Sequence, residues 1–137
     1  MNERLAALNL AAREALPGLL GVEVLEADGP TVRATMEVHS GLMAPNGYLH
    51  AASVVALADT ACGYGCWLGL PEDGPGFTTI ELKANFLGTA QEGILVCNAT
   101  RVHGGRTTEV WDAEVLDPQG RRIALFRCTQ MILQKRI

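Results

Sequence analysis

The stretch from His50 to Leu70 constrains the fold most, because nearly every position in it is apolar or small. Alanine, valine, leucine and cysteine dominate, and a helix without a polar face must be buried on most of its sides. Between Glu37 and Glu72 only Asp59 carries a formal charge at neutral pH. We therefore expect one long central helix, enclosed by the rest of the chain and carrying a single carboxylate.

The segments on either side of this helix alternate apolar and polar residues, as strands do. Their breaks contain glycine, proline, aspartate and glutamine, which are typical of turns and connecting loops. The expected strands are 21–27 and 31–38 before the helix, and 78–87, 94–102, 107–116 and 122–133 after it. The first two predict a hairpin, and the last four predict an antiparallel meander. An amphipathic helix, stopped by Pro17-Gly18, precedes them all.

A chain of 137 residues with 48% hydrophobic content is long enough for one core and too short for two ordinary domains. We expect residues 1–137 to form a single α+β domain. In it, a twisted antiparallel sheet of about six strands wraps round the central helix, and an N-terminal helix lies against the outside. The open edges of such a sheet favour association with another copy.

The charge pattern excludes some partners. The net charge is −4 and the eleven lysine and arginine residues are scattered, so we expect no nucleic-acid partner. The first residues lack the hydrophobic core of a signal peptide, and later apolar runs are interrupted by glycine, proline or charge, so we expect a cytoplasmic protein with no membrane partner. The four cysteines lack zinc-type spacing, which favours reduced core residues, and no metal or cofactor motif is present.

The isolated carboxylate of Asp59 is a candidate functional group. A charge in apolar surroundings is costly unless it is paired, hydrogen-bonded or functional. Two interpretations remain open. Asp59 either takes part in a reaction, or it does no chemistry and instead caps a break in the helix or accepts hydrogen bonds from neighbouring hydroxyls such as that of Thr60.

The turn at 45–50 delivers the chain into the helix, whose first amides point outward and carry the positive end of the helix dipole. The amide of Ala51 or Ala52 could therefore hold a developing oxyanion, although every helix begins with free amides. Ala51 and Asp59 are eight residues apart, which places them about 12 Å apart along one helix. One reacting group cannot use both from the same chain. We therefore expect a homodimer in which each site combines Ala51 of one subunit with Asp59 of the other.

Two further polar residues have an open role. His50 stands at the helix start, where it either caps the helix or helps to polarise a carbonyl group. Arg106 follows two glycines and is expected in a hairpin turn, exposed to solvent or in contact with a phosphate.

Two motifs resemble a known family. Gly47-Tyr48-Leu49-His50-Ala51-Ala52, followed by Leu57-Ala58-Asp59-Thr60-Ala61, is similar to the G-x-x-H-G-G…L-A-D/E-T signature of hotdog-fold thioesterases. The likeness is strongest to the phenylacetate-degradation type and to the Arthrobacter-type 4-hydroxybenzoyl-CoA thioesterases. It extends over most of the chain, including the strand-like run 79–87.

The resemblance implies roles for individual residues. It makes Asp59 the nucleophile or general base, the Ala51 amide the donor to the thioester carbonyl, and Thr79 a hydroxyl that positions water or the carboxylate. Substrate contacts are expected from the helix start and one later hairpin, namely from Gly47, Tyr48, Ala52 and Arg106. It also implies a dimer that pairs into a tetramer.

This chain departs from the family pattern in two places. Ala51-Ala52 replaces two glycines. The backbone amide donor is kept, but the two added methyl groups narrow the space through which an acyl group would approach it. The asparagine or glutamine expected fifteen residues before the carboxylate falls on Ala44, while Asn46 lies two positions later. Asn46 is therefore the candidate to replace that amide side chain.

The expected function is hydrolysis of a small aryl or medium-chain acyl-CoA without a cofactor. A non-catalytic acyl-CoA sensor is the first alternative, although it would normally need an output domain. A hotdog dehydratase is the second, although His50 lacks the proline-rich strand context of those enzymes.

Overall fold

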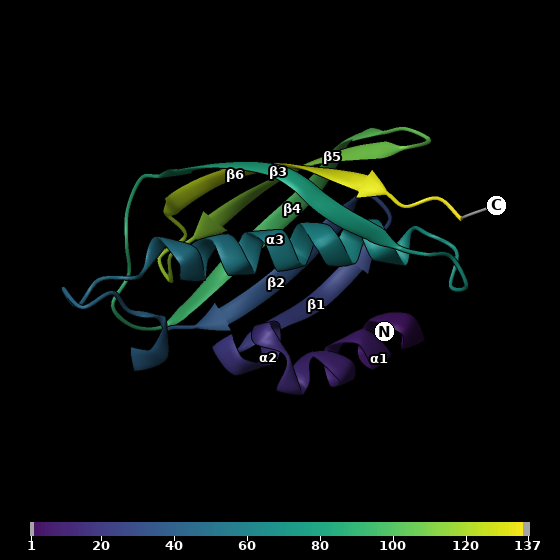
Figure 1. Cartoon of the computed structure of the whole chain (residues 1–137). Coiled ribbons are helices and arrows are strands. Elements are labelled where there is room, and N and C mark those ends of the chain that lie inside the picture. Colours follow the sequence, from purple (N-terminus) through teal and green to yellow (C-terminus); the bar gives the residue numbers. More distant parts are fainter. Residues whose placement is uncertain (1, 136–137) are drawn as a thin grey trace.

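The computed structural model describes residues 2–135 and contains a single six-stranded sheet with one long helix across it (Figure 1). The helices are α1 (Glu3–Ala11), α2 (Leu16–Leu20) and α3 (Ala51–Leu68), with short 3-10 helices at Ala12–Glu14 and Ser40–Leu42. The strands are β1 (Val22–Asp28), β2 (Thr31–Glu37), β3 (Phe77–Phe86), β4 (Ile94–Gly104), β5 (Thr108–Leu116) and β6 (Arg122–Ile132). The predicted α+β hotdog architecture is thereby confirmed.

The order of the strands corrects one expectation. The sheet runs β1-β2-β4-β5-β6-β3, with all neighbours antiparallel. The predicted β1–β2 hairpin is present, but only β4, β5 and β6 form a meander, because β3 pairs with β6 at the far edge. Burial explains this order. The central strands β4, β5 and β6 contain fully buried residues, whereas β3 contains none and so suits an edge.

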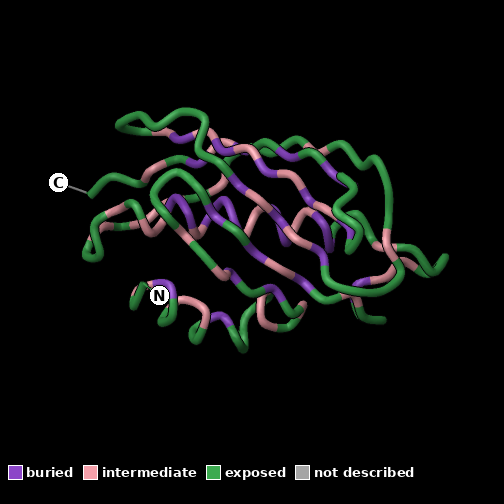
Figure 2. Tube along the Cα trace, turned by 180° about the vertical axis from the view of Figure 1, so that it is seen from behind, coloured by how far each residue is buried: buried purple, intermediate pink, exposed green. Residues whose placement is uncertain are grey.

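Helix α3 lies in the concave face of the sheet, and nine of its eighteen residues are buried. Figure 2 shows the buried positions gathered along α3 and on the strands that face it. The contact is close at Gly65, where an added Cβ would collide with the side chains of Trp111 and Val32. Burial of one face therefore explains most of the apolar character of this helix.

Helix α3 also has the length and mean hydropathy, 1.2, that a membrane-spanning helix can have. Half of it is buried inside the fold. Packing against the sheet accounts for its composition without a lipid contact.

The N-terminal segment differs from the single helix expected. Pro17-Gly18 does not stop a helix but begins α2, since proline is tolerated in the first helical turn where no backbone N–H is required. Before it, α1 packs through the buried Leu5. The guanidinium of Arg4 lies 4.5 Å from the centre of the Trp67 ring and donates to the carbonyl of Leu68 across 3.0 Å. The N-terminal helix thereby holds the end of α3.

Candidate active site

Asp59 lies midway along α3, on the side that the sheet covers only partly. Its carboxylate is half-buried, and Oδ1 accepts a hydrogen bond of 3.0 Å from the hydroxyl of Thr79 on β3. Burial raises the pKa of Asp59 above its ordinary value of 3.8, and the Thr79 hydrogen bond partly opposes this shift. The hydroxyl partner is thus Thr79 on a distant strand and not the neighbouring Thr60.

The first two backbone amides of α3 differ in their hydrogen bonding. His50 is the N-cap, and its Nδ1 accepts the N–H of Ala52 across 2.9 Å. Its carbonyl accepts the N–H of Ser53 across 3.0 Å. Within residues 2–135, no hydrogen-bond partner is found for the N–H of Ala51, the first residue of the helix. Ala51 is therefore the available donor, while Ala52 is already used for capping.

The turn before the helix is held by its own backbone. Ala44 donates to the carbonyl of Tyr48 across 2.7 Å, and Gly47 has a φ of +87°, a conformation that favours glycine. The side chain of Asn46 is exposed, and its Oδ1 accepts the N–H of Tyr48 across 3.1 Å. This contact shapes the turn and leaves the Nδ2 group of Asn46 at the surface.

The remaining predicted residues lie at opposite ends of α3. The side chain of Tyr48 is 50% exposed beside the helix start. Arg106 is exposed in the β4–β5 hairpin and lines a cavity of about 490 Å³ with residues of the loop that follows α3. Asp59 and Thr79 are therefore brought together by a side-chain hydrogen bond between α3 and β3. Ala51 and its turn form a second group, and Arg106 lies beyond the other end of the helix.

One polar residue of this region was missed by sequence reasoning. Gln130 on β6 is fully buried, and its side-chain amide lies 2.7 Å from the hydroxyl of Thr79. The signal that could have found it is its register. Gln130 follows Phe126 and Cys128 at a spacing of two, so it belongs to the face of β6 that packs against α3.

Two buried thiols near Asp59 are poor nucleophiles. A hydrogen bond with Cys128, together with burial, raises the pKa of Cys62 well above the ordinary value. Burial raises the pKa of Cys66 to about 12. A raised pKa keeps both thiols protonated near neutral pH, and a protonated thiol is a weak nucleophile.

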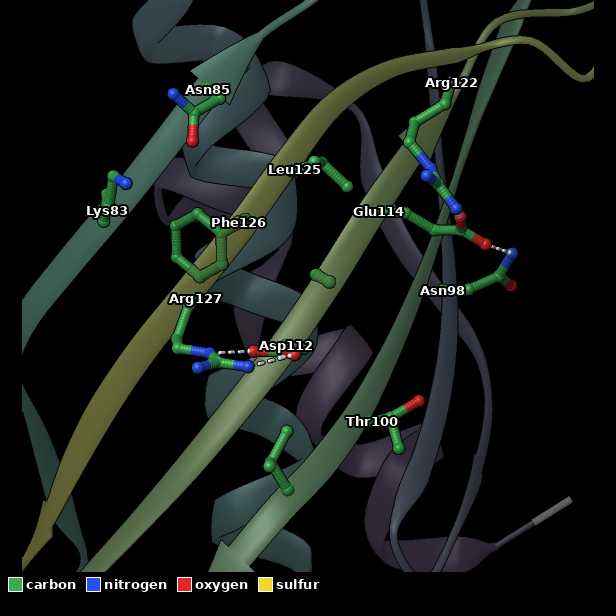
Figure 3. Close-up of a pocket in the computed structure, with 12 residues that line it drawn as sticks. Lys83, Asn85, Asn98, Thr100, Asp112, Glu114, Arg122, Leu125, Phe126 and Arg127 are labelled. Atoms are coloured by element: carbon green, nitrogen blue, oxygen red, sulfur yellow. Dashed lines mark hydrogen bonds and ion pairs between the residues drawn. The ribbon is translucent and has the colours of Figure 1, made fainter.

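A separate hollow lies on the opposite face of the sheet, with α3 behind the strands (Figure 3). Four of its charged side chains form two pairs, and Lys83 also lines it. Arg127 Nη2 donates to Asp112 across 2.8 Å, and Arg122 pairs with Glu114 across 3.1 Å. None of the predicted site residues lines this hollow.

Comparisons with known proteins show the family of this chain. The Thioesterase superfamily matches residues 46–124. A putative esterase, ComA2 of Bacillus subtilis, is 35% identical over 85% of this chain and 92% of its own length. The 1,4-dihydroxy-2-naphthoyl-CoA hydrolase of Escherichia coli is 31% identical over 94% of each chain.

Solved structures show the same fold over nearly the whole chain. A mutant of the thioesterase PA1618 from Pseudomonas aeruginosa superimposes with a TM-score of 0.91, at 28% identity, covering 97% of this chain and 96% of its own. The PaaI protein of the Escherichia coli phenylacetic acid degradation operon gives a TM-score of 0.80 at 26% identity, covering 95% and 94%.

The hotdog fold and these relatives make the protein a thioester hydrolase. The chain belongs to the Thioesterase superfamily, and the resemblance seen in its motifs is confirmed.

Proposed function

We propose that this protein hydrolyses acyl-CoA thioesters to a free acid and CoA, with Asp59 as the reacting carboxylate and Ala51 of a partner subunit as the oxyanion donor. The observation that carries the proposal is the half-buried Asp59, held by Thr79 in an apolar helix and still open on one side. The Thr79 hydrogen bond favours the ionised form of this carboxylate, and an ionised carboxylate can attack a carbonyl or activate water without a separate base.

Two routes lead from this arrangement to the same products. In the first, Asp59 attacks the thioester carbonyl, the carbon–sulfur bond breaks, CoA leaves as a thiol after protonation, and water cleaves the resulting anhydride. In the second, Asp59 takes a proton from water as the water oxygen adds to the carbonyl carbon. The tetrahedral intermediate then collapses, the carbon–sulfur bond breaks, and the CoA thiolate takes up the proton held by Asp59. In both routes the carbonyl oxygen becomes negative, and an N–H at a helix start stabilises that charge.

The separation of Ala51 and Asp59 supports a site shared by two subunits. Eight helical residues span about 12 Å, whereas one thioester needs both groups within about 3 Å. Two copies of α3 that run antiparallel across a two-fold axis would bring Ala51 of each close to Asp59 of the other. His50 acts in this proposal by capping the helix and orienting the Ala51 amide.

The surface of the chain has a place for such a partner. Strand β3 is an edge strand, and its large side chains Ile80, Leu82 and Phe86 are 51%, 42% and 46% exposed. An open, apolar edge is a liability for a monomer and suits pairing with a second copy. Because Thr79 lies on this strand, the same contact would order the hydroxyl that holds Asp59.

The proposed substrate is a small aryl or medium-chain acyl-CoA. A CoA hydrolase is among the relatives, and Gly47, Tyr48 and Ala52 stand where an acyl group would enter beside the Ala51 amide. The methyl groups of Ala51 and Ala52 narrow this entrance. Arg106, in the hairpin beyond the C-terminal end of α3, would meet the phosphates of CoA.

A tetramer and a cytoplasmic setting complete the proposal. The outer face of the sheet keeps apolar side chains exposed, among them Val102 at 54% and Leu125 at 39%, which would suit a second contact between dimers. All four cysteines are buried and free, as is usual in a reducing compartment.

The test is release of free thiol from a panel of aryl and aliphatic acyl-CoAs, followed with a thiol reagent. Each acyl group is also supplied as its N-acetylcysteamine thioester, which lacks the CoA phosphates. We expect hydrolysis of part of the panel and a lower KM for the CoA forms. If no member releases thiol although CoA esters bind, the protein is a sensor; hydration of an enoyl-CoA without thiol release would make it a dehydratase.

A further inference from the structure

Gln130 is a polar side chain enclosed in the core behind the candidate active site. It is 0% exposed, and it stands opposite Thr79 in the β3–β6 pair. A buried amide that lacks hydrogen-bond partners is costly, and Gln130 has two neighbours that can serve, the hydroxyl of Thr79 at 2.7 Å and Sγ of Cys128 at 3.4 Å.

The proton count around Thr79 determines which way this amide faces. The hydroxyl oxygen lies 3.0 Å from Asp59 Oδ1 and 2.7 Å from the side-chain oxygen of Gln130, and both are acceptors. One hydroxyl has one proton and cannot donate to both. The oxygen and nitrogen of an amide occupy nearly the same positions, so the network decides between them.

Turning the Gln130 amide over gives every group a partner. Its NH₂ then donates to Thr79 Oγ1, and the Thr79 proton goes to the Asp59 carboxylate. The Gln130 oxygen now faces Cys128, whose thiol can donate to it. In the opposite orientation the hydroxyl proton points toward Gln130, and a half-buried carboxylate is left without its donor.

We propose that Gln130 is a positioning residue for the hydrolysis at Asp59, because its NH₂ donates to Thr79 and thereby directs the Thr79 hydroxyl proton to the carboxylate. This inference rests on the proposed function. Gln130 itself is fully buried and does not touch substrate, so its role differs from that expected of an amide at position 44. It acts on Asp59 only through Thr79.

Few other groups titrate next to this network. Cys62, on α3 one turn beyond Asp59, and Cys128 on β6 carry the nearest thiols, and a hydrogen bond with Cys128 and burial raise the pKa of Cys62 well above the usual range. On β5, the carboxylate of Glu109 stands in register with Gln130 and accepts the indole N–H of Trp111 across 2.8 Å. Strand β3 contributes the non-titrating Thr79. Asp59 is the carboxylate that accepts from Thr79, so the part of the acidic limb that responds to loss of the Thr79 hydroxyl reports on Asp59.

The test combines Gln130→Met, which keeps the size of the side chain but has no donor, with Thr79→Val, which removes the hydroxyl. For each variant and for the double variant, kcat/KM is measured against pH. We expect Gln130→Met to move the acidic limb to higher pH and to lower kcat with little change in KM. Thr79→Val should move the limb further, and adding Gln130→Met to it should change nothing more.

Two results would overturn the proposal. The acidic limb of Gln130→Met could move to lower pH, because a hydroxyl released from Gln130 would turn toward Asp59. Alternatively, Gln130→Met could change the pH dependence of kcat/KM by the same amount whether residue 79 is threonine or valine.

Neutron diffraction from crystals of the unmutated protein gives a second test that does not depend on folding of a variant or on activity. The proposal places the Thr79 deuteron toward Asp59 and both amide deuterons of Gln130 on the atom that faces Thr79. A Thr79 deuteron that points to Gln130 contradicts it. If the unmutated protein hydrolyses no acyl-CoA, the proposed function fails while this map still decides the proton positions.

Discussion

Asp59 and Thr79 are twenty residues apart in the sequence and are joined by a hydrogen bond of 3.0 Å. One lies on the central helix α3 and the other on the edge strand β3. The carboxylate is therefore held between the best-packed element of the fold and the strand that we expect to pair with a partner subunit. In the proposed mechanism, this contact links catalysis to assembly of the dimer.

Removing the Thr79 hydroxyl should move the pH dependence of the reaction. Burial already raises the pKa of Asp59 above 3.8, so kcat/KM should increase as the pH rises through that raised value and the carboxylate ionises. In Thr79→Val the lowering effect of the hydrogen bond is lost, and the acidic limb should move to higher pH. A Thr79→Ser variant, which keeps a hydroxyl, should move it less. Coincident limbs for valine and serine would show that the hydroxyl has no effect on Asp59.

Asp59→Asn should lower activity and raise stability. We expect kcat/KM to fall more than about 100-fold, because the reacting carboxylate is gone. Folding raises the pKa of Asp59, so the free energy of unfolding decreases as the pH rises from 3.8 through the raised pKa and the buried carboxyl ionises. An asparagine at this position stays neutral, so Asp59→Asn should have a higher Tm at pH 7. Thermal unfolding at pH 7 checks the second effect. Asp28→Asn, in the exposed β1–β2 turn, is the matched control and should change neither quantity. Nearly full activity in Asp59→Asn would exclude the mechanism.

Ala51→Pro should remove the oxyanion donor and leave the helix intact. Proline lacks the N–H, is favoured at the first helical position, and requires an extended residue before it, which His50 is, with φ −68° and ψ 134°. We expect kcat to fall by about 100- to 1,000-fold with an unchanged helical circular-dichroism signal. Ala51→Gly, which keeps the N–H, is the control and should stay active and accept bulkier acyl groups. Equal activities of the proline and glycine variants would mean that this amide binds no oxyanion.

Asn46→Asp should separate the two roles that Asn46 can have. Aspartate keeps the oxygen that accepts the N–H of Tyr48 and removes the NH₂ that would contact substrate or water. If Asn46 replaces the amide missing at Ala44, we expect about a tenfold loss in kcat/KM, the cost of one hydrogen bond. Asn46→Ala removes both contacts. Full activity in the aspartate variant combined with loss in the alanine variant would restrict Asn46 to shaping the turn.

Much of the fold could be predicted because its signals are local. The unbroken apolar run round Asp59 indicated a central helix, and Asp28-Gly29-Pro30 indicated a hairpin. The pairing of β3 with β6 could not be predicted in this way. The segment after β3 crosses to the other side of the sheet before β4 begins, and the residues of β3 do not indicate which strand pairs with it. Pro17 was misassigned because proline both ends helices and begins them.

The residues of the candidate site could be predicted where their side chains differ clearly in polarity or charge from their sequence neighbours. Asp59 is conspicuous as the only charge in its region, and Thr79 came from the resemblance alone. Gln130 was missed because it is uncharged and lies in a strand where polar and apolar residues alternate, so it does not differ from its sequence neighbours. Its role becomes visible only from its register with Thr79. The proposed division of the site between two chains is inferred from helix spacing, because the contacts within one chain do not contain it.

The shared site is tested most directly by mixing two inactive variants, Asp59→Asn and Ala51→Pro, after dissociation and reassociation of the subunits. In a mixed dimer, one site receives the intact Ala51 amide from the first variant and the intact Asp59 from the second, while the other site receives neither. Because half of the dimers are mixed and each has one complete site, we expect activity to return to about a quarter of that of the unmutated protein. A mixture that stays as inactive as its two components would contradict a site built from two subunits.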